Sequence, residues 1–458
     1  MERKFPPGPN AAFLVANALE FARNPLNFLL KCTQIYGDVV HFAIQNQHYY
    51  LVNNPEYVYE ILVQQTDKFK KPPFFNELLG NLSGVSLLTM NGELHRQRRR
   101  LMQPAFHHQR INDYTATMVQ HTSQMVECWN ANQTYNMADE MMLLSMNIVA
   151  ETLFGANALN EGYAVGQALI EFMDYYVHQI MLPVRIPAWI PLKRHTRARK
   201  ATETIDKTMM KIIETRRAAA EDTGDLLSML LMSIDEDTGE RLTNQEIRDE
   251  AAILFSVGYE TTALALTWTL YLLAEHPEAD AHLAEELNNV LQGRLPTIKD
   301  LPDLKYTAMV LKEAMRLYPP AWAFGRQAIQ EIQVGDYTVV KDAFVVLCPF
   351  IMHRNPNYFE QPLEFNPERF ADGYEKRMPR YAYFPFGGGA HMCIGATFAT
   401  VQSVLSLATI AQKYRFTLEP NSKVEIEPLI TIRPKYGLFL RTIARDKRLT
   451  PVPDLAVE

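Results

Sequence analysis

The chain has 458 residues, of which 47% are hydrophobic and 21% are charged. This composition is typical of a globular protein with a sizeable core, and we find no low-complexity tract and no internal repeat. The formal net charge of -7 argues against a general nucleic-acid binder, because such a protein needs a basic surface. Since no linker divides the sequence, we expect one domain over residues 1–458.

The N-terminus and the cysteines predict a cytoplasmic protein without a membrane span. A Pro-Pro-Gly-Pro run occupies residues 6–9, no signal peptide precedes it, and Asn17 and Glu20 interrupt the apolar stretch at 11–22. A chain whose N-terminus had been trimmed would show the same sequence pattern. No disulfide, zinc or iron–sulfur spacing relates the four cysteines, which fits a reducing compartment: Cys32, Cys128, Cys348 and Cys393.

The first half of the chain is predicted to be mostly helical after one β-hairpin. Two β-rich segments, 39–44 and 48–52, are separated by a short polar turn that is typical of a hairpin. A polar and basic segment follows at 91–100. Residues 137–154 have the apolar content of a core helix, and a Pro-rich stretch precedes a basic helix start at 193–200.

A long central helix is the strongest structural signal of the second half. Thr243 and Glu246 form a capping-box pattern, and no proline interrupts the apolar run until Pro277. A helix of about 33 residues spans roughly 50 Å, which is long enough to cross a domain. Its apolar centre predicts burial. Beyond Pro319 the sequence becomes strand-like and Pro-rich, so we expect a mainly α fold with small β-sheets (α+β).

Cys393 lies on a loop that contains three consecutive glycines, Gly387, Gly388 and Gly389. Glycine allows close backbone approach, and the apolar segment 396–411 predicts a helix that begins just after the cysteine. A helix N-terminus favours the thiolate, which is a strong axial ligand for heme iron. Taken alone, however, a cysteine near glycines is more often a buried structural residue.

The pattern Phe-x-x-Gly-x-x-x-Cys-x-Gly from Phe386 to Gly395 resembles the heme-ligand loop of the cytochrome P450 superfamily. The resemblance implies heme b, with Cys393 as the iron ligand and Phe386 and His391 in the cofactor-binding loop. It also implies the cytochrome P450 fold, in which the long helix and the cysteine loop sandwich the heme. His391 departs from the arginine that is more common there, so its contact with a heme propionate would be weaker and pH-dependent.

The middle of the long helix carries Gly258, Glu260 and Thr261, which are unusual in an apolar helix. The glycine and threonines predict a kink or an inserted water. By themselves they are equally consistent with a threonine bonded to the preceding turn and an acid facing water. The segment resembles the oxygen-activation motif of the family, which implies that Thr261 hydrogen-bonds the activated oxygen and Glu260 relays protons. Val257 replaces the usual Ala or Gly and predicts a narrower pocket.

Glu313 and Arg316 are three residues apart on a predicted helix, so they share one face. Such a pair is commonly an exposed ion pair of little energetic value. Arg369, within Asn-Pro-Glu-Arg-Phe, follows in the order that the family uses. The resemblance therefore implies a buried network of Glu313, Arg316 and Arg369 that braces the segment before the cysteine loop.

Basic residues near the N-terminal third resemble the family's heme-edge helix. His95 and Arg99 are four residues apart and share a face, and the resemblance implies that both hold a propionate; Arg326 is a further candidate. The absence of a tryptophan there is typical of soluble bacterial members. Further cations predict a docking surface for an acidic ferredoxin or flavodoxin that is kept reduced by its own reductase: Arg96, Arg98, Arg100, Lys376, Arg377 and Arg380.

The family order also implies where a substrate binds. The implied positions are mostly apolar, which predicts a lipophilic substrate such as a fatty acid, a terpenoid or a steroid-like molecule. Ile430 and Thr431 are expected to close the far end. The other expected contacts are Phe74, Phe75, Leu87, Phe172, Met173, Val257, Ala321, Trp322 and Phe324.

These patterns favour a monooxygenase that inserts one oxygen atom of O2 into its substrate, with Glu260 and Thr261 as the catalytic pair. Two alternatives remain at this stage. A peroxygenase or isomerase on the same fold would tend to lack the acid–alcohol pair. A non-enzymatic heme sensor or carrier would bind heme without turnover.

Overall fold

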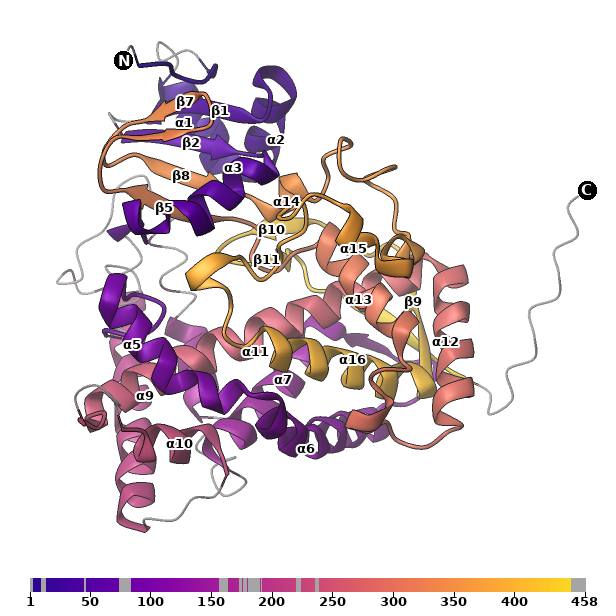
Figure 1. The fold of residues 1–458 in the computed structure, drawn as a ribbon. Coiled ribbons are helices and arrows are strands. Elements are labelled where there is room, and N and C mark those ends of the chain that lie inside the picture. Colours follow the sequence, from indigo (N-terminus) through magenta and orange to yellow (C-terminus); the bar gives the residue numbers. More distant parts are fainter. Residues whose placement is uncertain are drawn as a thin grey trace, which may run out of the picture.

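Helices dominate the computed structural model of the protein, as the sequence predicts (Figure 1). The structure describes residues 3–9, 14–44, 47–73, 84–155, 164–172, 175, 179, 190, 192–219, 224–234 and 239–445. The longer helices pack in one part of the molecule, and the largest sheet lies with the N-terminal helices at the opposite end. The expected mainly α architecture with small sheets is confirmed.

Two groups of helices build this arrangement. The longer ones are α5 Gly92–Met102, α6 His108–Glu127, α7 Met137–Phe154, α9 Lys193–Ala219, α11 Asn244–Glu275, α12 Pro277–Leu291, α13 Lys305–Leu317 and α16 Ala396–Lys413. The shorter ones are α1 Leu14–Arg23, α2 Pro25–Tyr36, α3 Pro55–Tyr59, α10 Leu226–Met232, α14 Pro349–Met352 and α15 Tyr374–Arg377.

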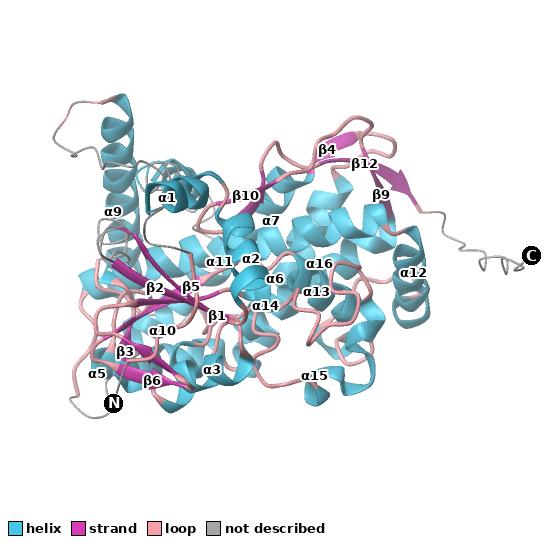
Figure 2. Ribbon diagram, turned by 90° about the horizontal axis from the view of Figure 1, so that it is seen from above, coloured by secondary structure: helices cyan, strands magenta, loops and turns pink. Residues whose placement is uncertain are grey.

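The largest sheet has the strand order β1-β2-β8-β5-β3, visible as a twisted layer in Figure 2. β2 and β8 are parallel, and the other neighbours are antiparallel. Its strands are β1 Val39–Ile44, β2 Gln47–Val52, β3 Phe69–Lys70, β5 Phe324–Ala328 and β8 Phe344–Leu347. The remaining small sheets use β4 Thr134–Asn136, β6 Ile332–Val334, β7 Tyr337–Val339, β9 Tyr414–Leu418, β10 Ile426–Pro428, β11 Ile432–Pro434 and β12 Phe439–Ala444.

The long helix α11 connects the two main hydrophobic clusters. Its N-terminal half, including Phe255, packs with α7, α9 and α10, while Leu266 and Leu270 pack with α6, α7, α12, α13 and α16. Thr243 and Glu246 make both bonds of the capping box, and the helix ends before Pro277. α11 continues as an α-helix through Gly258, and Thr261 and Thr262 each bond to a carbonyl group of the preceding turn. The kink or inserted water at this point stays a prediction.

Several other expected elements are also confirmed. The hairpin β1–β2 has the expected strands, α7 has the expected bounds, and α16 begins three residues after Cys393. Within the described ranges, no helix is both long enough and apolar enough to cross a bilayer.

Candidate active site

The cysteine loop is folded so tightly that its glycines are required. Gly387 and Gly389 adopt positive φ angles of 70° and 64°. A Cβ atom on Gly389 would lie 1.9 Å from the carbonyl oxygen of Leu62, and one on Gly388 would lie 2.1 Å from the Tyr381 ring. No side chain fits at these distances. The Cys393 N–H closes the loop by donating to the Phe386 carbonyl oxygen at 3.0 Å.

The Cys393 side chain lies in a recess: it remains accessible, yet protein surrounds it. Burial raises the pKa of its thiol, although the Gly395 N–H and the positive charge of Arg99 act in the opposite direction. The N–H at the helix start thus favours the thiolate, as expected, but burial outweighs it in the polypeptide by itself. A coordinated metal ion would displace the thiol proton, because its charge exceeds these local effects.

The middle of α11 presents an open stripe in an otherwise buried helix. Val257 is 40% exposed, and Gly258 and Thr261, at helical spacing from it, are half-buried. Leu254, on the same side of α11, borders the hydrophobic cluster that Ile394 also borders. The cysteine loop and the side of α11 that carries the open stripe thus border the same hydrophobic cluster. Within the open stripe, the Thr261 hydroxyl donates to the Val257 carbonyl oxygen at 2.8 Å.

Glu260 lies on a different side of α11 from Thr261. It is 4% exposed, and its Oε1 atom accepts hydrogen bonds from Thr431 Oγ1 at 2.5 Å and from Arg433 Nη2 at 2.6 Å. Both partners belong to the β10–β11 hairpin. The acid is thus held by a segment that follows it by more than 170 residues, an arrangement that no local sequence signal indicated.

Glu313 and Arg316 are fully buried and form a bidentate pair at 2.7 and 2.8 Å. Arg369 Nε approaches Glu313 Oε1 at 3.4 Å, so the structure brings the three expected residues together. Arg316 also donates to three backbone carbonyl groups, one of them that of His353 at 2.8 Å.

His353 links this network to the cysteine loop. Its ring Nε2 accepts the Phe384 N–H at 3.0 Å, and the Phe384 carbonyl oxygen accepts the Gly387 N–H at 3.0 Å. Burial, followed by the charges of Arg316 and Arg354, holds the His353 pKa well below its ordinary value. A neutral ring is therefore available as an acceptor. Sequence reasoning missed this histidine because no spacing relates it to the cysteine.

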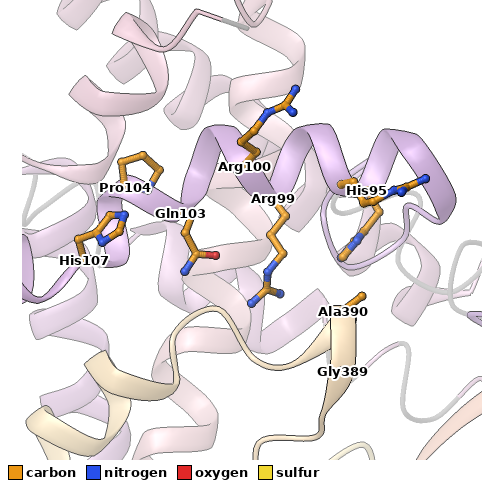
Figure 3. A pocket seen from close by; sticks show the side chains of 9 residues that line it. His95, Arg99, Arg100, Gln103, Pro104, His107, Gly389 and Ala390 are labelled. Carbon is orange, nitrogen blue, oxygen red and sulfur yellow. The ribbon is translucent and has the colours of Figure 1, made fainter. Parts of the chain in front are cut away.

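Five basic side chains lie in or beside the cysteine loop. We call them the cation cluster: Lys71, His95, Arg99, Arg326 and His391. Three of its members contact one another or the backbone of the cysteine loop. His95 Nε2 and His391 Nδ1 are 3.1 Å apart, and Arg99 Nη1 donates to the Met392 carbonyl oxygen at 2.6 Å. Figure 3 shows the Arg99 side chain pointing from α5 toward the strand of chain that carries Gly389.

The members of the cation cluster disfavour one another's charge. Burial, with Arg326 and Arg99 nearby, lowers the pKa of Lys71 to about 7. Burial and the neighbouring cations lower the pKa of His95 to about 4 and that of His391 to about 2, and burial lowers that of Arg326 to about 10. The two histidines are therefore neutral near pH 7, and the positive charge that an anionic ligand would neutralise is that of Lys71, Arg99 and Arg326.

Lys71 is a cluster member that the sequence did not reveal. The β3–β5 register pairs Phe69 with Ala328 and Lys70 with Gln327, so the next residue along, Lys71, lies opposite Arg326. Like charges in this position repel each other. Lys71 Nζ donates to the Leu87 carbonyl oxygen at 2.7 Å. The only sequence signal was a basic pair before Pro72.

Heme fits these residues. It needs a thiolate ligand for the iron, a close backbone approach beside that ligand and cations for its two carboxylates. The Cys393 recess, the Gly387 and Gly389 turns and the cation cluster supply each of these. Phe386, half-buried against the larger core cluster, closes the loop through its carbonyl group.

Comparison with known proteins agrees with this geometry. The family model for cytochrome P450 matches residues 6–440. Cyclooctatin synthase of Streptomyces melanosporofaciens is 33% identical over 426 residues, covering 93% of this chain and 92% of the relative. Cyclooctat-9-en-7-ol 5-monooxygenase of the same organism is 33% identical over 418 residues, covering 90% of each chain. Pentalenene oxygenase of Streptomyces avermitilis is 31% identical over 438 residues, covering 95% of this chain and 97% of the relative.

The chain therefore belongs to the cytochrome P450 family. It is a cytochrome P450 monooxygenase, which implies a heme-iron cofactor, O2, an electron donor and a lipophilic substrate.

The structure describes only some of the residues that are expected to contact the substrate. Phe172 is 1% exposed and packs within the cluster of α7, α9 and α11, so its expected role as a pocket wall is wrong. Phe74, Phe75 and Met173 lie outside the described residues. Half-buried or more open positions remain for Val257, Ala321, Trp322, Phe324 and Ile430, and Leu87 and Thr431 are buried.

The expected docking cations also need one correction. Arg98 is 5% exposed at its side chain and pairs with Glu246 at 2.6 Å, so it is not part of a surface patch. Arg96 and Arg100 are exposed and line an open pocket of about 460 Å³ that Gly389 and Ala390 close on the loop side. Lys376, Arg377 and Arg380 are exposed on or just after α15.

Proposed function

We propose that this protein is a single-domain heme b monooxygenase that hydroxylates a cyclic, terpenoid-like hydrocarbon in the cytoplasm. The reaction is RH + O2 + 2e⁻ + 2H⁺ → ROH + H2O. One observation carries the proposal: Ile394, next to Cys393, and Leu254, on the side of the open stripe of α11, border the same hydrophobic cluster. Among the substrate classes that the apolar contacts allow, the names of the relatives favour a cyclic hydrocarbon such as pentalenene or an alcohol built on one, such as cyclooctat-9-en-7-ol.

Each group in the site has a separate task in this proposal. Cys393 binds the iron, and the cation cluster holds the two propionates. Bound heme supplies the oxygen-activating chemistry that the polypeptide lacks. The Thr261 hydroxyl orients oxygen by hydrogen bonding, Glu260 stores and passes a proton, and the apolar side chains keep bulk water away from the substrate.

The expected electron donor is an acidic ferredoxin or flavodoxin. Exposed cations on α5 and α15 support electrostatic docking near the cysteine loop. The rate of reduction by such a donor should fall as ionic strength rises, and Arg100→Glu should reduce that salt dependence. A rate independent of salt in the wild type would contradict this mode of docking.

The reduced carbon monoxide spectrum tests the proposed ligation. Wild type should give the strongly red-shifted Soret band of a thiolate ligand, and Cys393→His should lose it while retaining heme. Cys128→Ser is the matched control, because Cys128 is an exposed free cysteine at the end of α6. A red-shifted band in Cys393→His would overturn the assignment. Spin-state titration with pentalenene, a steroid and a fatty acid then separates the substrate classes.

Thr261→Ala tests turnover. This change removes the hydroxyl that faces the open stripe, so the fraction of consumed O2 released as hydrogen peroxide should rise several-fold. Thr262→Ala is a suitable control, because Thr262 is buried and bonds only to the Gly258 carbonyl among the described residues. Unchanged peroxide release in Thr261→Ala would count against its role, and no turnover under oxygen in the wild type would favour a heme sensor.

A further inference from the structure

Among the described residues, the Glu260 carboxylate accepts hydrogen bonds at one of its two oxygen atoms. Thr431 Oγ1, Arg433 Nε and Arg433 Nη2 all donate to its Oε1 atom, at 2.5, 2.9 and 2.6 Å. None of these bonds ends on Oε2. A carboxylate oxygen without a donor is the one at which a proton can be taken up and released.

The hairpin that supplies these donors is itself fixed at its turn. The Trp268 indole N–H donates to the Ile432 carbonyl oxygen at 3.1 Å, and the Trp322 indole N–H donates to that of Leu429 at 2.8 Å. Trp268 is fully buried and lies two helical turns after Glu260 on α11. The same helix therefore fixes both the acid and the segment that holds it.

Arg433 joins the buried acid to the protein surface. Its side chain is 32% exposed, whereas that of Glu260 is 6% exposed. Burial lowers the pKa of Arg433, but the charge and hydrogen bonds of Glu260 outweigh this effect and raise it. Arg433 thus links Glu260, the residue next to Thr261, to the solvent.

The hairpin also borders the expected substrate space. Ile430 lies in its turn, half-buried against the cluster that Leu254 and Ile394 border, and Trp322 is half-buried next to Ala321. A molecule that contacts these side chains would press on the segment that orients Glu260.

We propose that Arg433 and Thr431 are positioning residues for proton supply, through which the β10–β11 hairpin aligns the Glu260 carboxylate. This inference rests on the proposed monooxygenase function. The reaction consumes two protons per oxygen inserted; Arg433 remains protonated throughout and only holds the carboxylate. Thr431 supplies a hydrogen bond that fixes the rotation of the carboxyl group.

The test uses the full-length, heme-loaded protein, reduced by NADPH through a plant-type ferredoxin and its reductase. NADPH oxidation and hydrogen peroxide are measured in H2O and D2O, without added lipophile. Arg433→Gln should slow O2-dependent NADPH oxidation about tenfold and enlarge the solvent isotope effect, and Arg433→Lys should restore much of the rate. Thr431→Val should have a smaller effect in the same direction, and Thr431→Ser should behave as wild type.

The double variant separates positioning from simple damage. If Arg433 acts through Glu260, Glu260→Gln with Arg433→Gln should be no slower than Glu260→Gln alone. The control is Lys435→Gln, which removes an exposed ion pair with Glu425 at the end of the same hairpin. Independent, multiplying effects in the double variant would overturn the inference, as would an Arg433→Gln protein that matches Lys435→Gln. A wild type without O2-dependent oxidation would instead contradict the proposed function itself.

Discussion

Two charged regions contact the cysteine loop or the residues just before it, one fully buried and one partly buried, and they neutralise charge in different ways. In the Glu313 network, five hydrogen bonds occupy all the N–H donors of Arg316, and the carboxylate of Glu313 balances its charge. In the cation cluster, Lys71 makes one side-chain hydrogen bond among the described residues, to a neutral carbonyl group.

The difference separates a structural site from a binding site. A network that satisfies its own charges stabilises the chain and has no need of a ligand. A cluster of cations that lower one another's pKa is complete only when an anion is bound. We therefore expect changes in the first region to affect folding, and changes in the second to affect cofactor affinity.

Glu313→Ala should have the largest effect. It leaves Arg316 buried without a counter-charge, at a cost of about 3–5 kcal/mol, so little heme-loaded protein should be recovered. Purified heme content and the melting temperature measure this. The control is Glu375→Ala, which removes a half-exposed ion pair with Lys312. Normal heme content in Glu313→Ala would mean that the network does not support the cysteine loop.

Glu250 should make stability depend on pH. Its oxygens accept the Leu87 N–H at 2.9 and 3.0 Å, and burial raises its pKa to about 7 from the ordinary 4.5. Because the folded state binds this proton more tightly, the contribution to stability is full below pH 4.5 and is lost as the pH rises through about 7.

Between about pH 5 and about pH 8, wild type should lose up to about 3 kcal/mol relative to Glu250→Gln. Urea unfolding followed by circular dichroism at several pH values measures this difference. Glu246→Gln is an informative control: burial raises the Glu246 pKa, but bonds from Thr243 and Arg98 outweigh burial and lower it. Its contribution is therefore lost on acidification instead. Parallel pH profiles for wild type and Glu250→Gln would refute the assignment.

Lys71→Met should weaken heme binding about tenfold, because one charge-assisted contact to a carboxylate is lost. Binding of heme and of heme dimethyl ester to the apoprotein should be compared, since the ester lacks the anionic carboxylates. Only the affinity for heme should fall if Lys71 binds a propionate. An equal loss for both compounds would assign Lys71 a structural role through Leu87. The control is Lys70→Met, one residue away in β3.

The sequence predicted elements whose signals are local. Residues 137–154 form the expected helix, and α11 begins at the expected capping box, because apolar runs and end signals are read within a few residues. Cys393 was identified from its glycine spacing, which the positive φ angles of Gly387 and Gly389 explain. Gly258 lies within the continuous helix α11, which packs against a hydrophobic cluster in each half.

Residues that act through distant partners could not be predicted in this way. Lys71 gains its role from Arg326 across the β3–β5 ladder, and His353 gains its role from Phe384 and Arg316. Arg98 looked like part of a surface charge run, but it pairs with Glu246 inside the molecule. In each case strand register or helix packing determines the partner, and sequence spacing does not contain this information.

The sequence by itself thus determined the family, the position of the proposed iron ligand on its glycine turn and the order of the helices, because these depend on residue type and short spacing. Only the tertiary structure decided which side of α11 meets the β10–β11 hairpin, so that Glu260 bonds Arg433 while Thr261 faces the open space. It likewise assembled five basic side chains from four separate segments of chain. Such charges lie far apart in sequence and acquire their pKa values only when folding removes them from water.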